Sequence, residues 1–222
     1  IAQKTHQKFV EEYLSDMIFM YNASDSTKIP LREKPVKIEK HLKTKAKKGR
    51  PKKSEQREPK KPIILKQQKD MSCANDMLSL VSTHCGVGIK QNSKGNREVW
   101  IGGKLHISVV DGDIPVTAFY SGANVHDSSL ALPLMNETSK RVSYLYDLQD
   151  AGYDSDIIRE FSKKLNHKPI IDINPKNSKE LKQKIQLEKD EKEKLKFLNL
   201  PLSSDEQHYN KRSMVERVNK YL

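Results

Sequence analysis

Three acidic residues occupy positions where a folded chain can present carboxylates to a crevice. Asp25 lies in or just after an apolar, β-branched run, and Asp150 follows the run RVSYLYDL at the end of an expected strand. Sites collect at strand ends in open α/β sheets, because a side chain there can face a crevice instead of the core. Glu216 lies on the last expected helix, where Tyr209, Arg212 and Glu216 share one face at i, i+3 and i+7.

This set of residues indicates phosphodiester chemistry. Carboxylates that are brought together repel one another, so they are stable as anions only beside a cation. Oxygen ligands alone favour Mg²⁺ or Mn²⁺. Two such ions about 4 Å apart can activate a water or a 3′-hydroxyl and stabilise the leaving oxygen of a phosphodiester. Asp25, Asp150 and Glu216 are therefore candidate catalytic and metal-binding residues, although a Glu four residues after an Arg is also a common surface ion pair.

The positive charge of the chain is concentrated in one segment. The net charge is +12, and residues 32–70 hold 16 Lys and Arg against 5 Asp and Glu. Such a run usually meets a polyanion, and nucleic acid is the expected partner; a solvated linker is the alternative. Within it, the stretch KGRPKK resembles the core of an AT-hook, which lays basic side chains in a narrow minor groove. The candidate DNA-binding residues there are Lys48, Arg50, Lys52 and Lys53.

The apolar periodicity predicts a chain of alternating strands and helices. The final helix is expected to be continuous from His208, and the first strand is expected to break around residues 22–26. Asp111-Gly112-Asp113 marks a hairpin turn. Helices are expected over 5–17, 130–135, 154–165, 177–199 and 208–222, and strands over 18–31, 98–110, 114–123, 141–148 and 168–174.

These elements predict an α/β fold with a mixed sheet flanked by helices and a long basic insertion after the first strand. We divide the chain into residues 1–30, a largely flexible basic insertion over 31–97, and the remainder of the domain over 98–222. Trp100 is expected in the core. Asp127 is expected to cap the helix that follows it, with a supporting role beside the metal site as the alternative.

Several classes of protein are not favoured by the sequence. No run approaches 18 consecutive apolar residues, and the first residues lack the apolar core of a signal peptide. The chain does not begin with Met, so it is expected to start inside a longer protein. Cys73 and Cys85 are too few for a disulfide framework, and their spacing with His84 is not that of a zinc finger. A cytoplasmic protein is therefore expected.

The residues around the candidate site resemble one known family. Tyr209-x2-Arg212-x3-Glu216 matches the Y-(2)-R-(3)-E-(6)-K signature of a large branch of the DDE transposases of bacterial insertion sequences, and the Lys would follow Leu222 by one residue. The runs SDSTKIPLREKP, GANVHDS, LYDLQDAGYDS and IIDINP resemble further segments of that family. The likeness covers residues from about 20 to 222, and its motifs are specific only when taken together.

The resemblance implies an RNase H-like fold with Asp25, Asp150 and Glu216 as ligands of two Mg²⁺ or Mn²⁺ ions. It also implies DNA strand cleavage and strand transfer at the ends of the element, with Tyr209 and Arg212 contacting DNA near the scissile phosphate. Double-stranded DNA is then the partner, no membrane is involved, a homodimer is a further possibility, and the setting is the bacterial cytoplasm at the nucleoid.

Two other functions remain open on the sequence alone. One is a catalytically inactive, DNA-binding remnant of a transposase, since the chain ends before the signature Lys and is expected to be truncated. The other is an RNase H-like nuclease that cuts without transferring strands. Metal-dependent cleavage separates the first from a transposase, and strand joining separates the second.

Overall fold

The computed structural model describes residues 2–35, 63–91, 95–176 and 178–221. Its centre is a six-stranded mixed sheet, in which the path β2-β3-β1-β5-β6 is joined by β4, paired to β3. The strands are β1 (Ile18–Pro30), β2 (Gly86–Gln91), β3 (Arg97–Val110), β4 (Ile114–Gly122), β5 (Ser143–Gln149) and β6 (Lys168–Ile171). The expected mixed α/β sheet is confirmed.

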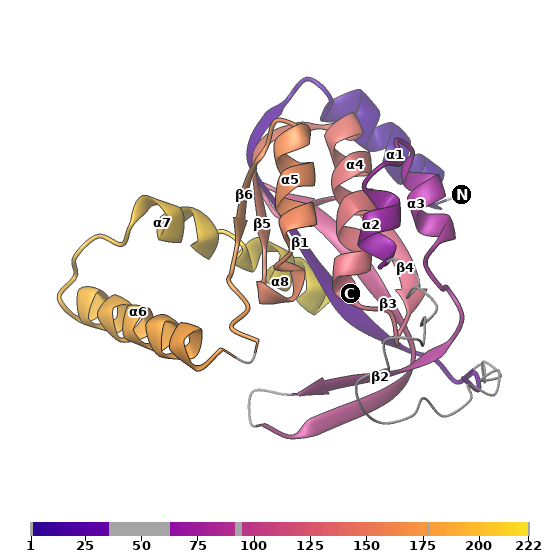
Figure 1. Cartoon of the computed structure of the whole chain (residues 1–222). Coiled ribbons are helices and arrows are strands. Elements are labelled where there is room, and N and C mark those ends of the chain that lie inside the picture. The colour runs from indigo at the N-terminus through magenta and orange to yellow at the C-terminus, as the bar shows by residue number, and fades with distance from the viewer. Residues whose placement is uncertain (1, 36–62, 92–94, 177, 222) are drawn as a thin grey trace, which may run out of the picture.

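Helices cover both faces of this sheet (Figure 1). The α4 and α5 helices lie together on one face with α2 and α3, and α8 packs against β1 and β3 on the other. The α6 and α7 helices stand to one side, and α6 buries no residue. The helices are α1 (Ala2–Tyr13), α2 (Ile64–Gln68), α3 (Ala74–Ser79), α4 (Ala131–Arg141), α5 (Asp156–Lys164), α6 (Lys179–Phe197), α7 (Ser204–Asn210) and α8 (Ser213–Tyr221), with 3₁₀ turns η1 (Asp127–Leu130) and η2 (Ala151–Tyr153).

The strand directions create a crevice at one edge. The β1 strand runs antiparallel to β3 and parallel to β5, which is itself parallel to β6. The β1–β5 pairing ends at Ala23 and Leu148, while β1 continues to Pro30 paired with β3 on its other side. The carboxyl end of β5 and the second half of β1 therefore border an open edge, which is where ligands bind in sheets of this kind.

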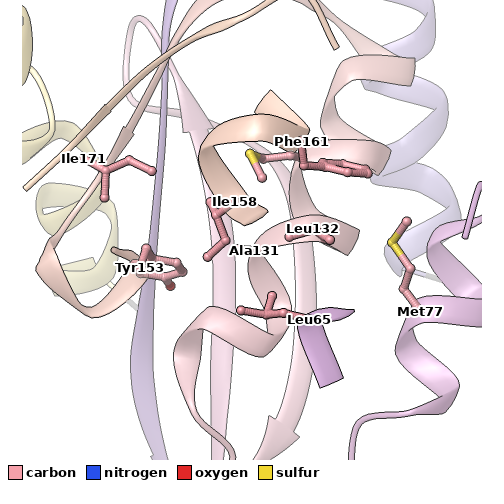
Figure 2. Packing of buried hydrophobic residues seen from close by; sticks show 9 residues of the cluster. Leu65, Met77, Ala131, Leu132, Tyr153, Ile158, Phe161 and Ile171 are labelled. Carbon is pink, nitrogen blue, oxygen red and sulfur yellow. The ribbon is translucent and has the colours of Figure 1, made fainter. Parts of the chain in front are cut away.

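Two apolar layers hold this framework in place. On one face, α4, α5 and the short helices bury the cluster drawn in Figure 2, including Met77, Leu132 and Phe161. On the other face, Met214 and Val215 of α8 pack onto residues of β1, β3 and β5. Since burial of each large apolar side chain contributes about 2 kcal/mol, these layers fix the sheet between the helices.

The predicted break in the first strand is wrong. The β1 strand is unbroken, because its polar residues face buried partners instead of a turn. Asn22 donates to Asp147 Oδ1 at 3.0 Å, and the hydroxyls of Ser24 and Ser108 lie 3.0 Å apart. Polar residues that are paired in this way are compatible with the interior of a sheet.

Part of the expected flexible insertion is folded. Residues 63–91 form α2, α3 and β2, and Leu65, Ala74 and Met77 are buried in the core. The Gln68 side chain is buried as well and donates to the carbonyls of Met77 and Ser129, each at 3.0 Å. The low apolar content of this stretch concealed a few well-spaced core residues. Residues 36–62 of the expected insertion lie outside the described residues.

The hairpin over β3 and β4 is confirmed, with Val110 paired to Ile114 across the turn. Gly112 and Asp113 both adopt positive φ, at 83° and 61°. Such turns favour Gly, Asn and Asp, which is why the sequence signal was strong here.

The predicted continuous last helix is instead two helices, α7 and α8, that meet at Lys211 and Arg212. Tyr209 therefore belongs to α7, Arg212 to the junction and Glu216 to α8. Within the described ranges, no helix is both long and apolar enough to cross a bilayer.

Candidate active site

A cleft of about 510 Å³ lies at the open edge of β1 and contains two of the three predicted acidic residues, Asp25 and Asp150. We call it the acidic cleft. Its other lining residues come from β1, β2, β3 and η1, and they are Ser26, Thr27, Lys28, Ile89, Lys90, Glu98, Trp100, Lys104 and Asp127. The topology thus brings together residues that are more than a hundred positions apart in the chain.

Asp25 is held in a setting that opposes its negative charge. Burial raises the pKa of its carboxyl to about 6, with the backbone N–H of Ser26 acting against the rise and Asp150 adding to it. Asn219 of α8 donates to Asp25 Oδ2 at 3.2 Å. A carboxylate that is withdrawn from water and faces other acids is stabilised when a cation enters.

Asp150 follows β5 directly, and its Oδ1 accepts from the backbone N–H of Gly152 at 2.9 Å. This hydrogen bond begins the η2 turn, and it uses one carboxylate oxygen of a residue that lines the cleft. A Cβ on Gly152 would lie 3.0 Å from Asp150 Oδ1, so the small residue allows the side chain its position. The sequence Asp150-Ala151-Gly152 therefore presents this carboxylate through local backbone geometry.

A third acid in the cleft, Asp127, was expected mainly as a helix cap. That expectation is wrong, because the side chain that caps η1 is His126, which accepts from Ser128 N. Asp127 instead accepts from Lys104 Nζ at 2.8 Å, and the same Nζ also donates to Val125 O at 2.9 Å. The alternative role beside the candidate metal site agrees with this placement.

His106 stands behind this ion pair. Its Nε2 lies 2.8 Å from Ser121 Oγ, and its Nδ1 lies 4.0 Å from Asp127 Oδ1 without a hydrogen-bond partner. Burial lowers the pKa of this imidazole to about 4, so the ring is neutral at pH 7. His106 and Lys104 were not predicted as site residues, because their only signal in the sequence is their alternation along one face of a strand.

Glu216, the third predicted ligand, does not line the acidic cleft in this structure. It accepts from Arg212 Nη2 at 2.5 Å, and its side chain is 53% exposed. Arg212 also acts electrostatically on Asp25, so its guanidinium influences a cleft acid as well as the helix acid. The structure thus places Asp25 and Asp150 in one cleft and holds Glu216 in an ion pair with Arg212 outside the lining of that cleft.

Tyr209 and Arg212 adjoin each other as their spacing indicated. The guanidinium carbon of Arg212 lies 5.7 Å from the centre of the Tyr209 ring, a cation–π contact. The Tyr209 hydroxyl donates to Asp172 Oδ2 at 2.7 Å, and burial together with this bond raises the pKa of the tyrosine. Asp172 lies just after β6, so this hydrogen bond ties α7 to the end of that strand.

The donor set of the cleft suits a hard divalent cation. Asp25, Asp127 and Asp150 offer carboxylate oxygens, the ligands that Mg²⁺ and Mn²⁺ prefer. Across the described part of the chain, however, no group of three or more His, Cys, Asp or Glu side chains is already arranged around one metal position. Asp25 and Asp150 have the type of donor atom that such an ion prefers, and Glu216 is not placed with them in the cleft.

Trp100 also lines this cleft, so its expected place in the core is wrong. It is half-buried on β3 and lies opposite Gly88 of β2. A lone Trp in a strand gives no sign of which side it faces, because that depends on the strand paired beside it. The candidate DNA-binding residues Lys48, Arg50, Lys52 and Lys53 lie outside the described residues.

Comparison with known proteins assigns the family. A family model described as "Transposase DDE domain" matches residues 23–222, nearly the whole chain. The protein therefore belongs to the transposase DDE domain family, and its mixed sheet agrees with the RNase H-like fold that the resemblance implied. No curated protein and no solved structure matches the chain.

Proposed function

We propose that this transposase domain cuts DNA at the ends of an insertion sequence and joins the released ends to target DNA, using divalent metal ions. The observation that carries the proposal is the meeting of Asp25 and Asp150 in one cleft at the open edge of the sheet, in a chain that belongs to the transposase DDE domain family. The fold alone would not decide the reaction, because one fold can host many activities.

Asp25 and Asp150 would hold the metal ions, and Glu216 would complete the set. Mg²⁺ or Mn²⁺ bound there would activate a water or a 3′-hydroxyl and stabilise the leaving oxygen of the phosphodiester. Double-stranded DNA, both the element ends and the target, is the proposed substrate, and the basic residues of the chain would bind its phosphates.

We infer that Glu216 has two alternative states, one bound to Arg212 and one released toward the cleft. In the structure, the guanidinium of Arg212 holds the Glu216 carboxylate at 2.5 Å. A DNA phosphate is a strong competitor for an arginine, since it offers two oxygens to the planar guanidinium. Binding of DNA at Arg212 would therefore release Glu216 toward the cleft, while Arg212 would neutralise charge on the phosphate. Tyr209 would keep this arginine in place through its ring.

The test is a cleavage assay with labelled duplex DNA that carries the terminal repeats flanking the gene, in Mg²⁺ or in EDTA. We expect Mg²⁺-dependent nicking that is lost in Asp150→Ala, while DNA binding survives. Asp156→Ala is a matched control, because it removes an exposed acid at the start of α5 outside the cleft, and it should cleave normally. Normal cleavage by Asp150→Ala would refute the assignment.

Two further outcomes distinguish the alternative functions. Pre-cut ends with a free 3′-hydroxyl should become joined to a target plasmid, whereas a nuclease would cut without joining. DNA binding with no cleavage by the full-length protein would indicate a catalytically inactive remnant. The observation that favours this last outcome is that Glu216 is exposed and paired with Arg212 instead of lining the cleft.

A further inference from the structure

The β2 strand and the first half of β3 form a two-stranded ribbon, residues 86–91 and 97–102, that extends past the rest of the sheet (Figure 1). Its inner side carries Trp100, the one tryptophan of the chain. Trp100 lines the acidic cleft together with Asp25 and Asp150. A large aromatic ring therefore borders the same space as the candidate catalytic carboxylates.

Two contacts fix the plane of this ring. The indole Nε1 donates to Gly103 O at 3.3 Å, so its one polar group is satisfied within the protein. Trp100 also lies directly opposite Gly88, where an added Cβ would come within 2.3, 2.4 and 2.6 Å of three neighbouring ring atoms. Nearly equal distances to adjacent ring atoms mean that the ring lies across the backbone of Gly88 and does not point its edge at it.

Cationic side chains share the cleft with this ring and with the acids. Lys28, Lys90 and Lys104 all line the same cleft. Lys28 is paired with Glu98 and Lys104 with Asp127, whereas Lys90 is exposed at the ribbon. A fixed aromatic plane that shares a cleft with lysines has the two elements that bind single-stranded nucleic acid, cations for the phosphates and a ring for the bases.

We propose that Trp100 stacks against an unpaired base of the DNA strand that occupies the acidic cleft, and that Gly88 is the positioning residue for its ring. This inference rests on the proposed function, since it names how the DNA is held at the same site. A base inside a duplex is covered on both faces by its neighbours. The base on Trp100 therefore belongs to a strand end or to a nucleotide that has left the stack.

The test uses the fluorescence of Trp100, which is free of interference from other tryptophans. The full chain is titrated in EDTA with a mixed-sequence single-stranded oligonucleotide and with an oligonucleotide of equal length whose central nucleotides are abasic. Binding is measured separately by the anisotropy of end-labelled DNA. We expect both DNAs to bind, with fluorescence quenched by the base-containing oligonucleotide and much less by the abasic one.

The same pair of measurements separates failure of this inference from failure of the proposed function. Binding of both oligonucleotides with equal quenching, or with none, would overturn the stacking proposal and leave the proposed function standing. Absence of any DNA binding would overturn the proposed function and this inference with it.

Variants then test the ring and its support. Trp100→Leu should weaken binding of the base-containing oligonucleotide by roughly 5- to 100-fold and leave the abasic one unchanged, as expected for loss of one stacked base. Trp100→Phe should retain part of the affinity. Phe197→Leu is the matched control, because this aromatic residue is 87% exposed on α6 and does not line the cleft. Equal weakening of both DNAs in Trp100→Leu would indicate a merely structural role and overturn the proposal.

Gly88→Ala provides a variant that keeps the fluorophore. Its Cβ would displace the ring from its present plane, so we expect weaker quenching and lower affinity for the base-containing oligonucleotide. Affinity for the abasic oligonucleotide should not change. Unaltered quenching in Gly88→Ala would remove Gly88 from the proposal.

Discussion

Asp25 and Asp147 are both carboxylates withdrawn from water on neighbouring strands, yet their surroundings differ in kind. Asp147 is 1% exposed, and its two oxygens accept from Asn22 at 3.0 Å and Ser162 at 2.5 Å. Among the residues that the structure describes, Asn219 is the side chain that donates to Asp25, which shares its cleft with Asp127 and Asp150.

Burial raises the pKa of both carboxyls, so burial by itself does not distinguish them. What distinguishes the two carboxyls is the set of groups that donate hydrogen bonds to their oxygens. Both oxygens of Asp147 accept hydrogen bonds from side chains of β1 and α5, so Asp147 links the sheet to a helix. Asp25 shares an open edge with other acids, and this is the setting in which we propose that a cation binds. Buried carboxylates whose oxygens have hydrogen-bond donors within the protein stabilise a fold. Carboxylates at strand ends that have few such donors and a shifted pKa are candidates for ligand binding.

The largest expected effect concerns Asp25. Asp25→Asn should abolish Mg²⁺-dependent DNA cleavage, because an amide is a poor ligand for Mg²⁺ and carries no charge. The cleavage assay measures this loss against the wild-type protein and against Asp156→Ala. Cleavage by the Asn variant at the wild-type rate would remove the distinction between the two acids.

The second effect concerns Asp147 and has the opposite character. Asp147→Ala should lower the free energy of unfolding by about 3 kcal/mol, since it leaves the buried donors of Asn22 and Ser162 unpaired. Urea denaturation followed by circular dichroism measures the change. Cleavage per folded molecule should persist, and a stable but inactive Ala variant would show that Asp147 belongs to the catalytic site after all.

The third effect is the pH dependence of stability that Asp25 causes in the absence of metal. Its pKa is raised from 3.8 to about 6 in the folded protein, so the folded state keeps a proton that the unfolded state has lost. Stability should therefore fall as the pH rises from about 4 to 6, by on the order of 2 kcal/mol, and then stay level. Asp25→Asn should lack this fall and be the more stable protein at pH 7.

Parallel denaturation curves of the wild type and Asp25→Asn in EDTA, taken from pH 4 to pH 7.5, measure this difference. Other groups titrate in both proteins, so only the difference between the curves reports on Asp25. A constant difference across the range would contradict the raised pKa.

A smaller effect is expected for the ion pair at the rim of the cleft. Lys104 and Asp127 are linked at 2.8 Å with side chains 14% and 34% exposed. A double-mutant cycle with Lys104→Met and Asp127→Asn should give a coupling energy of about 1 kcal/mol, the size expected of a partly buried pair. A coupling energy near zero would show that Lys104 does not stabilise the Asp127 carboxylate, and Asp127 would then resemble Asp25.

The smallest effect is expected for the exposed ion pair of Arg217 and Asp113, whose side chains are 55% and 40% exposed. Arg217→Ala should leave the thermal unfolding midpoint unchanged, because solvent screens such pairs. A clear drop in the midpoint would show that the α8 helix depends on this contact with the β3–β4 turn.

The sequence by itself determined the local features of this protein. The Asp-Gly-Asp turn fixed a hairpin, because positive φ is cheap for these residues. The position of Asp150 directly after a β-rich run placed its carboxylate at a strand end, and the spacing of Tyr209, Arg212 and Glu216 brought a cation–π contact and an ion pair. Each of these depends on residues a few positions apart.

Only the tertiary structure decided which distant groups meet. Residues 22–26 were expected to break a strand, and they continue it because Asp147 and Ser108 lie opposite Asn22 and Ser24. Asp127 was expected to cap a helix, and it instead accepts a hydrogen bond from Lys104. Trp100 lines a cleft because β2 pairs with β3 beside it. The local sequence limits the interactions that a side chain can make. The interaction it does make depends on its partner across the sheet, which comes from a distant part of the chain.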